Sequence, residues 1–220
     1  MENIKVIIFD AYGTLFDVNS AAEKCKNKIG DKWEQCADYW RTTQLEYTWL
    51  RSLMKRHKDF WKVTDESLDK SMRVFKIDNS LKNELLNLYR VLSTFSEVNE
   101  TIKKLNKKKY KLAILSNGTP DLLYELVKNN NLENFFEDIF SIEEVKTYKP
   151  HPDVYDIPIK KYHVQKDEVA YLSANTWDVS AAGNYGFKSV WVNRNNSVFD
   201  NLDYIPKHQI KHLGELLDKI

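Results

Sequence analysis

A short apolar run near the start of the chain ends in an aspartate, and this run most constrains the fold. Residues 5–17 read KVIIFDAYGTLFD, so β-branched and aromatic side chains give way to Asp10 and then to Gly13 and Thr14. This pattern predicts a strand that is buried on both faces, as in parallel sheets. Because open parallel sheets place active sites at the carboxyl ends of their strands, we expect Asp10 to lie at that edge and to act as a nucleophile.

The stretch from about residue 21 to residue 96 shows helical periodicity in place of a strand pattern. Residues 38–57 are predicted to form one long helix, because apolar side chains recur there at spacings of three and four. Thr64 and Ser80 are predicted to cap two further helices. Most aromatic residues of this stretch are expected to form the core of a small helical bundle: Trp33, Tyr39, Trp40, Tyr47, Trp49, Phe60 and Trp61.

From Val98 onward the pattern alternates between helix and strand. Strands are predicted at residues 111–115, 138–142, 169–172 and 189–192. The intervening helices include one at 152–162, which Pro158 is expected to kink or shorten, and one capped by Thr176. Alternating strands and helices imply a parallel sheet, so the fold class is predicted to be α/β with a doubly wound parallel sheet that a helical insertion interrupts after its first strand.

Composition excludes several classes of protein. The chain has 33 Lys and Arg against 32 Asp and Glu, so no overall charge favours a nucleic acid or a membrane surface. The lysine cluster at residues 103–111 is explained as the solvated end of a helix. No apolar run approaches the roughly 20 residues that span a bilayer, and the N-terminus lacks a signal-peptide pattern. We therefore expect a cytoplasmic protein, in which Cys25 and Cys36 form no disulfide.

Polar residues follow four of the predicted strands, where the strands end. Because the carboxyl ends of parallel strands share one edge, these residues are expected to meet in one crevice: Asp10, Thr14, Ser116, Asn117, Lys149, Ser173, Asn175 and Asp178. Alone, each is equally explained as a helix cap or a loop residue, but together they favour a shared site. Asp10 would attack the substrate, Lys149 would hold its charge, and Asp178 would activate water.

The motifs at these positions resemble those of the haloacid dehalogenase superfamily and, within it, the L-2-haloacid dehalogenases (type II). They read FDAYGTLFDV at 9–18, LSNGTP at 115–120, KPHPDVY at 149–155 and LSANTWD at 172–178. The helical insertion adds YWRTTQLEYTWLRSLM at 39–54, which resembles the cap of these dehalogenases. The resemblance implies a Rossmann-like doubly wound parallel sheet core at residues 1–16 and 97–220, with an inserted helical-bundle cap at residues 17–96.

This resemblance implies an (S)-2-haloacid dehalogenase, which hydrolyses short L-2-haloalkanoic acids to D-2-hydroxy acids and halide. Asp10 would displace halide from the carbon next to the substrate carboxylate and so form an aspartyl ester. Water, the co-substrate, would then attack the ester carbonyl of Asp10, leaving a single inversion at the substrate carbon. The family resemblance also implies a homodimer, with no nucleic-acid or membrane partner.

The resemblance also implies a role for each matching residue. Thr14, Lys149, Ser173 and Asn175 would position and stabilise Asp10, and Tyr155 and Asp178 would complete the network around Lys149 and the hydrolytic water. Ser116 would bind the substrate carboxylate together with backbone N–H groups beside Ala11 and Tyr12. The halide cradle and the apolar wall around the alkyl group would consist of Arg41, Asn117, Phe60 and Trp177.

Physical reasoning about Arg41 leads to the same expectation. Arg41 lies at the margin of the face of its predicted helix that should be buried. A buried guanidinium without a partner costs several kcal/mol, so Arg41 should meet an anion. The alternative is a salt bridge to an Asp or Glu of the chain. Without the family resemblance, Phe60 is by default a core residue.

One departure from the wider superfamily is informative. Its phosphatases carry a second aspartate two residues after the nucleophile, as a general acid and an aid to Mg²⁺ binding, whereas this chain has Tyr12 there. Halide leaves without a proton, so a dehalogenase needs no such acid. Asn175 stands where metal-binding relatives often have another acid, and we therefore predict no metal or other cofactor. The alternatives are a Mg-dependent small-molecule phosphatase on the same fold and a binding protein without turnover.

Overall fold

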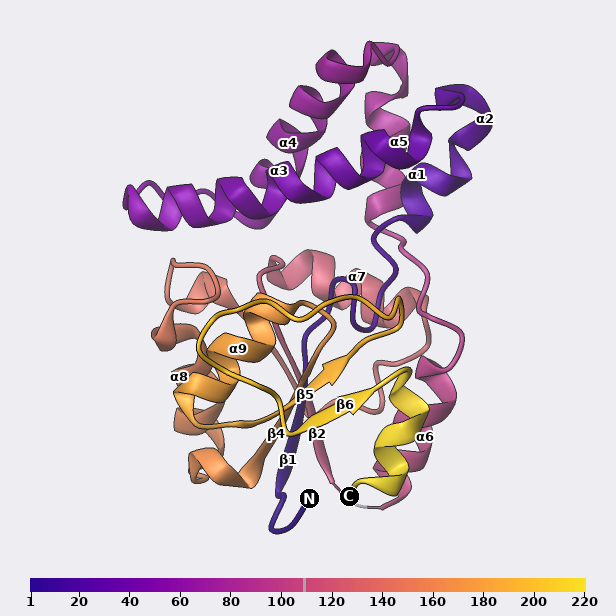
Figure 1. Cartoon of the computed structure of the whole chain (residues 1–220). Helices are drawn as coiled ribbons and strands as arrows, with labels where there is room; N and C mark the ends of the chain where they lie inside the picture. Colours follow the sequence, from indigo (N-terminus) through magenta and orange to yellow (C-terminus); the bar gives the residue numbers. More distant parts are fainter. Residues whose placement is uncertain (109) are drawn as a thin grey trace.

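The computed structural model describes residues 1–108 and 110–220, and in them a parallel sheet forms the centre of the molecule (Figure 1). The sheet has six strands in the order β3-β2-β1-β4-β5-β6, and every neighbouring pair is parallel. The strands are β1 (Val6–Phe9), β2 (Lys111–Ser116), β3 (Asp138–Ser141), β4 (Val169–Ser173), β5 (Lys188–Val192) and β6 (His208–Ile210). This arrangement confirms the predicted doubly wound α/β fold.

Strand β1 is the central strand and delivers Asp10 to the carboxyl edge. All four of its residues are fully buried, as expected for a strand with neighbours on both sides and helices on both faces. Phe9 lies opposite Ile114 of β2 and Leu172 of β4, and the Asp10 N–H continues the ladder with a 2.9 Å hydrogen bond to the Leu172 carbonyl. The chain order reverses between β1 and β4, so Asp10 lies at the switch point where such sheets bind ligands.

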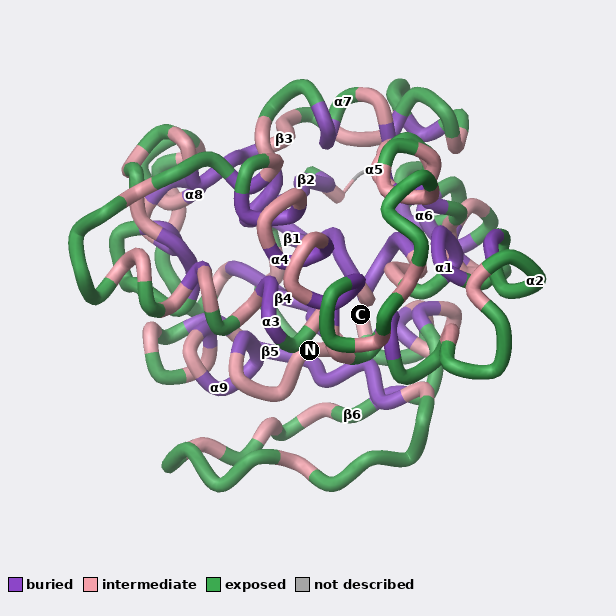
Figure 2. Tube along the Cα trace, turned by 90° about the horizontal axis from the view of Figure 1, so that it is seen from above, coloured by how far each residue is buried: buried purple, intermediate pink, exposed green. Residues whose placement is uncertain are grey.

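Helices cover both faces of the sheet (Figure 1). One face carries α6 (Val98–Lys107) and η4 (Leu213–Asp218), and the other carries α8 (Pro152–Tyr162) and α9 (Thr176–Tyr185). The remaining elements of this part are α7 (Pro120–Asn129), η2 (Ile142–Glu144) and η3 (Lys166–Glu168). Burial follows this layering, because the inner strands are buried whereas the segment that leads into β6 is largely exposed (Figure 2).

A second group of helices lies above the carboxyl edge of the sheet (Figure 1). It consists of α1 (Ser20–Lys24), α2 (Lys26–Ile29), α3 (Trp33–Leu53), α4 (Phe60–Phe75), η1 (Asn79–Leu81) and α5 (Lys82–Tyr89). The two chain segments that connect this group to the sheet are hydrogen-bonded to each other, from the Asp17 N–H to the Ser93 carbonyl and from the Phe95 N–H to the Leu15 carbonyl. The upper helices are therefore anchored directly beside Asp10.

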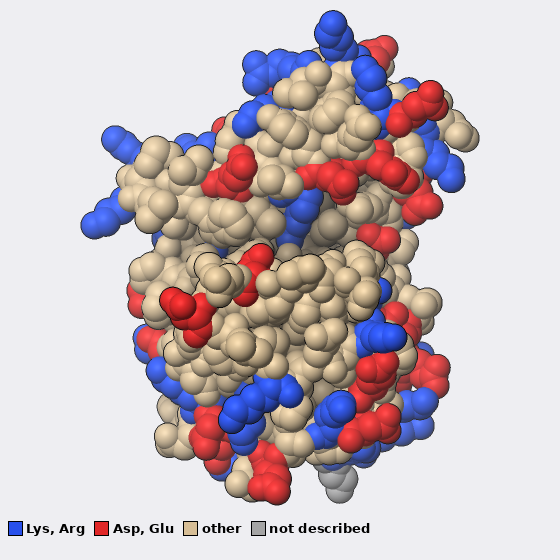
Figure 3. Space-filling view, in the orientation of Figure 1, with Lys and Arg blue, Asp and Glu red and all other residues tan. Residues whose placement is uncertain are grey.

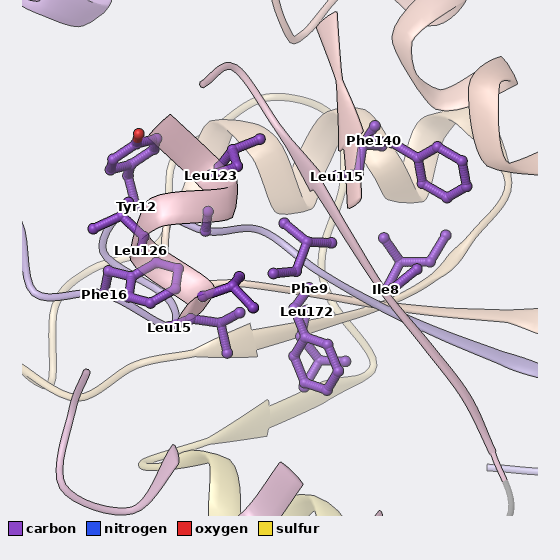
Figure 4. Packing of buried hydrophobic residues seen from close by; sticks show 14 of the residues in the cluster. Ile8, Phe9, Tyr12, Leu15, Phe16, Leu115, Leu123, Leu126, Phe140 and Leu172 are labelled. Atoms are coloured by element: carbon purple, nitrogen blue, oxygen red, sulfur yellow. The ribbon is translucent and has the colours of Figure 1, made fainter. Parts of the chain in front are cut away.

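A continuous apolar core joins the sheet to these connecting segments (Figure 4). In Figure 4, Leu15 and Phe16 of the segment that follows β1 lie beside Leu123 and Leu126 of α7, and all four belong to the core. Tyr12 extends the core toward the upper helices, since its ring lies 5.0 Å from that of Phe60 and 5.6 Å from that of Tyr89. Packing therefore fixes the loop after β1, which carries Thr14.

Three of the predicted helix caps are wrong, and in two of them an aspartate upstream takes the cap position. Helix α4 begins at Phe60 because Asp59 accepts a 2.8 Å hydrogen bond from the Lys62 N–H, whereas the Thr64 hydroxyl lies inside the helix and donates to the Phe60 carbonyl. Asp78 likewise replaces Ser80 as the cap, because it accepts from the Ser80 N–H at 2.8 Å. In both cases a carboxylate upstream of the predicted cap accepts from the free N–H groups at the start of the helix.

Other predictions meet mixed outcomes. Asn175 rather than Thr176 occupies the N-cap position of α9, and the Thr176 hydroxyl donates to Asp200 instead. Helix α8 continues unbroken through Pro158, because the lost hydrogen bond is offset by burial of that face against the sheet. Strand β6 was not predicted, since its sequence, HQI, has no apolar run. Both cysteines are free, as expected.

Two further predictions concern the lysine cluster and the absence of a membrane-spanning helix. Of the lysine cluster at 103–111, Lys109 lies outside the described residues, and Lys104 and Lys107 occupy the last turn of α6. None of the described helices has both the length and the apolar character needed to cross a membrane.

Gly183→Ala is expected to destabilise the protein by about 1–3 kcal/mol. A Cβ atom on Gly183 would lie 2.0 Å from Cζ of Tyr204, whose hydroxyl is hydrogen-bonded to Ser189 at 2.9 Å. Chemical denaturation measures the loss. In a Tyr204→Ala background the loss should disappear, because the ring that the new Cβ would meet is gone and alanine favours a helix over glycine. An equal loss in both backgrounds would contradict the steric explanation.

Candidate active site

The carboxylate of Asp10 accepts hydrogen bonds from residues at the ends of strands β1 and β4 and from the buried Lys149. Its Oδ2 atom accepts from Thr14 Oγ1 at 2.9 Å, from Asn175 Nδ2 at 2.9 Å and from Ser173 Oγ at 3.4 Å. Its Oδ1 atom accepts from Lys149 Nζ at 3.0 Å. Asp10 is only 6% exposed, so these contacts hold its carboxylate in one orientation. The structure therefore brings together five of the predicted residues.

The turn after β1 directs the Thr14 hydroxyl toward Asp10. Gly13 adopts a φ of 85°, a left-handed conformation that favours glycine and allows the chain to turn back. The Thr14 oxygen accepts a hydrogen bond from the Ala174 N–H at 2.8 Å, which leaves its own hydrogen for Asp10. The start of α9 is tied in similarly, because the Asn175 N–H donates to Ser173 Oγ at 3.1 Å.

Lys149 is a fully buried cation with three partners. Its ammonium group donates to Asp10 Oδ1 at 3.0 Å, to Asp178 Oδ2 at 3.1 Å and to the Tyr171 hydroxyl at 2.5 Å. These contacts account for all the N–H donors of an ammonium group, which offsets the high cost of burying the charge. The Lys149 backbone N–H also donates to Asn117 Oδ1 at 3.1 Å, which joins the second predicted motif to the third.

Asp178 is fully buried and shares the Lys149 ammonium with Asp10. Its Oδ1 accepts from the Tyr155 hydroxyl at 2.7 Å, and its Oδ2 accepts from Tyr171 at 2.8 Å as well as from Lys149. Burial raises the pKa of Asp178, while the charge of Lys149 and the two hydroxyl donors oppose that shift. Asp178 is therefore a stronger base than an exposed aspartate. Tyr155 thus lies in the predicted network around Lys149, although Pro158 follows it by three residues in α8.

Tyr171 is a residue of this network that the sequence prediction missed. It lies in the apolar strand β4, where an aromatic residue reads as part of the core. The only available signal was its spacing, because residues 171 and 173 point to the same face of a strand. Gln44 was missed for a similar reason, since it lies within a helix that was examined for its apolar face.

Arg41 lies on α3 and is held by Gln44 rather than by an acid. Its Nη1 donates to Gln44 Oε1 at 2.8 Å, and Gln44 Nε2 in turn donates to Thr64 Oγ1 at 2.7 Å and to the Tyr89 hydroxyl at 3.1 Å. Within residues 1–108 and 110–220, no carboxylate forms a salt bridge with Arg41, so the alternative expectation for this residue is not met. Arg41 therefore retains donors for an anion.

Aromatic side chains line the space between the sheet and the upper helices. Phe60 is 1% exposed and packs on Tyr12, and burial raises the pKa of the Tyr12 hydroxyl well above its usual range, so this group stays neutral. Trp177 meets Trp49 of α3 edge to face, with ring centroids 5.5 Å apart. Phe60 and Trp177 thus each form an aromatic contact between the upper helices and the sheet part.

Ser116 and the backbone N–H groups that follow Asp10 lie at the same edge of the sheet, and none of them is hydrogen-bonded to the Asp10 carboxylate in the described part of the chain. Ser116 ends β2, and its buried Oγ accepts from the Gly118 N–H at 3.1 Å. Within the described part of the chain, the N–H groups of Ala11 and Tyr12 donate to no other residue. Two backbone donors are therefore available next to the Asp10 carboxylate.

The surroundings of Asp10 are richer in donors than in metal ligands. Its nearest charged neighbour is the Lys149 ammonium, and the Asn175 side chain presents its NH₂ group rather than its oxygen. Across the described ranges, no three His, Cys, Asp or Glu side chains are grouped so that they could hold a metal ion. Metal independence stays a prediction.

A cavity of about 300 Å³ borders this edge, with Gly13, Asn175 and Trp177 among its lining residues. The surface is hollowed between the upper helices and the sheet part (Figure 3). The hollow gives a small molecule access to the carboxyl edge, whereas the cavity itself is lined by residues of the sheet part and its connecting segments alone.

Comparison with known proteins identifies the family. The family of haloacid dehalogenase-like hydrolases matches residues 7–192. The chain belongs to this family. It is 36% identical over 219 residues to (S)-2-haloacid dehalogenase 4A of Burkholderia cepacia, covering 98% of this chain and 94% of that protein. It is 38% identical over 218 residues to (S)-2-haloacid dehalogenase 1 of Pseudomonas sp. (strain CBS-3), covering 98% and 96%.

Solved structures of dehalogenases have the same fold as this chain over almost its whole length. L-2-haloacid dehalogenase from Xanthobacter autotrophicus matches with a TM-score of 0.90 and 33% identity, covering 97% of this chain and 96% of that one. The same enzyme with chloropropionic acid covalently bound matches with a TM-score of 0.89 and 32% identity, with the same coverage. The predicted fold and family are confirmed.

Lys149→Met is expected to lower the free energy of unfolding by about 3–5 kcal/mol near neutral pH, because two buried carboxylates lose their cation. Without Lys149 the pKa of Asp178 should rise further above its unfolded value, so stability is lost as pH rises through the folded pKa. Thermal unfolding should therefore show a larger loss at about pH 8 than at about pH 5.

Lys146→Met is the matched control for that measurement. The Lys146 side chain is 65% exposed and pairs only with Glu143 among the described residues. Its replacement should change stability little at either pH. An equal loss at both pH values for Lys149→Met would contradict the charge-pairing explanation.

Proposed function

We propose that this protein is an (S)-2-haloacid dehalogenase that converts short L-2-haloalkanoic acids and water into D-2-hydroxy acids and halide. The observation that carries the proposal is the Asp10 carboxylate, held by Lys149, Thr14 and Asn175 at the carboxyl edge of the sheet. The names of the relatives and the covalent chloropropionic acid complex of the Xanthobacter enzyme support it. None of the relatives compared above supports the phosphatase alternative, which also lacks an acid at Tyr12.

The two oxygens of Asp10 differ, and this difference suits the first step. Oδ2 accepts three side-chain hydrogen bonds, whereas Oδ1 accepts one, from Lys149. An oxygen with three donors has no free lone pair, whereas Oδ1 has only one donor and keeps a lone pair for attack on carbon. Oδ1 would attack the halogen-bearing carbon from the side opposite the halogen, and the carbon–halogen electron pair would leave with the halide.

The same arrangement suits hydrolysis of the ester. Once Oδ1 is bonded to the substrate carbon, Oδ2 is the ester carbonyl oxygen. Thr14, Ser173 and Asn175 then donate to the oxygen on which negative charge develops, as in an oxyanion hole. Asp178 would take a proton from the water that attacks the Asp10 carboxyl carbon. Because water never attacks the substrate carbon, that carbon is inverted only once.

Substrate binding would use the groups around this edge. The free N–H groups of Ala11 and Tyr12, with Ser116, would bind the substrate carboxylate. Arg41, which forms no salt bridge with the described residues, would donate to the departing halide and bind it together with Asn117. Phe60 and Trp177 would enclose the alkyl group, together with the ring of Tyr12.

We propose in addition that residues 17–96 form a cap domain over a catalytic core at residues 1–16 and 97–220. The hydrogen bonds between the two connecting segments support this division, since helices α1 to α5 lie between those segments in the chain. The homodimer remains a prediction from the family resemblance, and the cytoplasmic location remains a prediction from the hydropathy pattern of the sequence.

The protein is expected to release one equivalent of chloride from (S)-2-chloropropionate in the presence of excess EDTA. Asp10→Asn should abolish release, because an amide is a poor nucleophile. Asp153→Asn is the matched control, since this carboxylate is exposed at the start of α8 and should be dispensable. A strict requirement for Mg²⁺, or chloride release by Asp10→Asn, would contradict the proposal.

A single turnover in heavy-oxygen water tests the ester mechanism. Label should enter the Asp10 carboxylate and be absent from the first hydroxy acid formed, because the oxygen of that product comes from Oδ1. Mass spectrometry of the protein and the product measures both. Label in the first product and none in Asp10 would show that water attacks the substrate carbon directly.

A further inference from the structure

The hydroxyl of Tyr171 lies between the two charged groups that the proposed reaction uses, and it has no assigned role. It is 2.5 Å from Lys149 Nζ and 2.8 Å from Asp178 Oδ2. The side chain is fully buried, so no water competes for these contacts. Tyr171 is therefore a third polar member of the buried pair of Lys149 and Asp178.

The direction of both hydrogen bonds follows from the chemistry of the partners. An ammonium group can only donate, so the Tyr171 oxygen accepts from Lys149. The single hydrogen of the hydroxyl is then free for the Asp178 carboxylate, which accepts it. Burial raises the pKa of Tyr171 well above its usual range, so the hydroxyl keeps this hydrogen.

Packing holds the hydroxyl in this position. The Tyr171 ring meets the Tyr155 ring edge to face at 5.8 Å and lies 6.0 Å from the ring of Phe187. Strand β4 itself is buried along its whole length and paired on both sides. The oxygen therefore cannot leave Lys149 and Asp178 without repacking the core.

We propose that Tyr171 is a positioning residue, which holds the Lys149 ammonium against Asp10 and keeps Asp178 ionised as the base for ester hydrolysis. This inference rests on the proposed function. Tyr171 touches neither Asp10 nor the space above it, so it acts through Lys149 and Asp178. Without the hydroxyl, one N–H of Lys149 would lose its buried acceptor and Asp178 Oδ2 would lose its neutral donor.

The charges around Asp178 determine the direction of the expected pH effect. The groups that face it are Lys149, Tyr155, Tyr171 and, beyond Lys149, the carboxylate of Asp10. Lys149 and the two hydroxyls favour the ionised form, whereas burial and Asp10 favour the protonated form. Removing the Tyr171 hydroxyl should therefore raise the pKa of Asp178, so that the base is protonated over a wider range of pH.

The kinetic test compares Tyr171→Phe with Tyr185→Phe. Tyr185 also donates its hydroxyl to a carboxylate, that of Asp156, and packs against Tyr155 and Phe187, but it contacts neither Lys149 nor Asp178. Tyr171→Phe should lower kcat for (S)-2-chloropropionate roughly ten-fold and move the acidic limb of the kcat profile up by about one pH unit, with little change in KM. Tyr185→Phe should leave the position of the limb unchanged.

A stability measurement provides a readout that does not depend on turnover. The Tyr171 hydroxyl stabilises ionised Asp178, so Tyr171→Phe should lower the unfolding temperature more at about pH 8 than at about pH 5. In the Asp178→Asn background this pH dependence should vanish, because the titrating partner is gone. An acidic limb that coincides with wild type, or a loss of stability that is the same at both pH values, would overturn the inference. If wild type releases no halide, the proposed function fails, and the unfolding data alone decide the role of Tyr171.

Discussion

The ion pairing of one buried lysine organises this molecule. Lys149 is fully buried between Asp10 and Asp178, and its contacts join the end of β1 to the start of α9. Burying three charges is costly unless each is paired and hydrogen-bonded, so the sheet must bring these segments together precisely enough for every donor to find an acceptor. The all-parallel order with β1 at its centre supplies that geometry, because each strand end points to the same edge.

The second constraint is that the two oxygens of Asp10 have different hydrogen-bond partners. One oxygen accepts three side-chain donors and the other faces Lys149, so a single rigid arrangement suits both attack on carbon and later hydrolysis of an ester. In the proposed reaction the upper helices would complete the site from above the carboxyl edge of the sheet. Their contribution centres on Arg41, which Gln44 orients through a buried hydrogen-bond network and which keeps donors for an anion.

The sequence predicted the parts that depend on local pattern. The five longer strands and the polar residues at their ends were found, because a buried parallel strand is a continuous apolar run and its last residue is easily seen. Strand β6 was missed, since three residues that pair at the edge of the sheet leave no such pattern. The caps at Thr64 and Ser80 were wrong because Asp59 and Asp78 are equally good cap residues, and only the backbone path decides which side chain reaches the free N–H groups.

The sequence by itself determined the family and predicted the nucleophile with the residues that surround it, because these occur as short motifs at strand ends. The tertiary structure decided which oxygen of Asp10 each donor meets and added Tyr171 and Gln44 to the network. Asp10 and Lys149 are 139 residues apart in the chain, and a hydrogen bond depends on direction and on tenths of an ångström. A tyrosine inside an apolar strand has the same local sequence whether its hydroxyl serves the core or the site, so only the packed fold distinguishes the two.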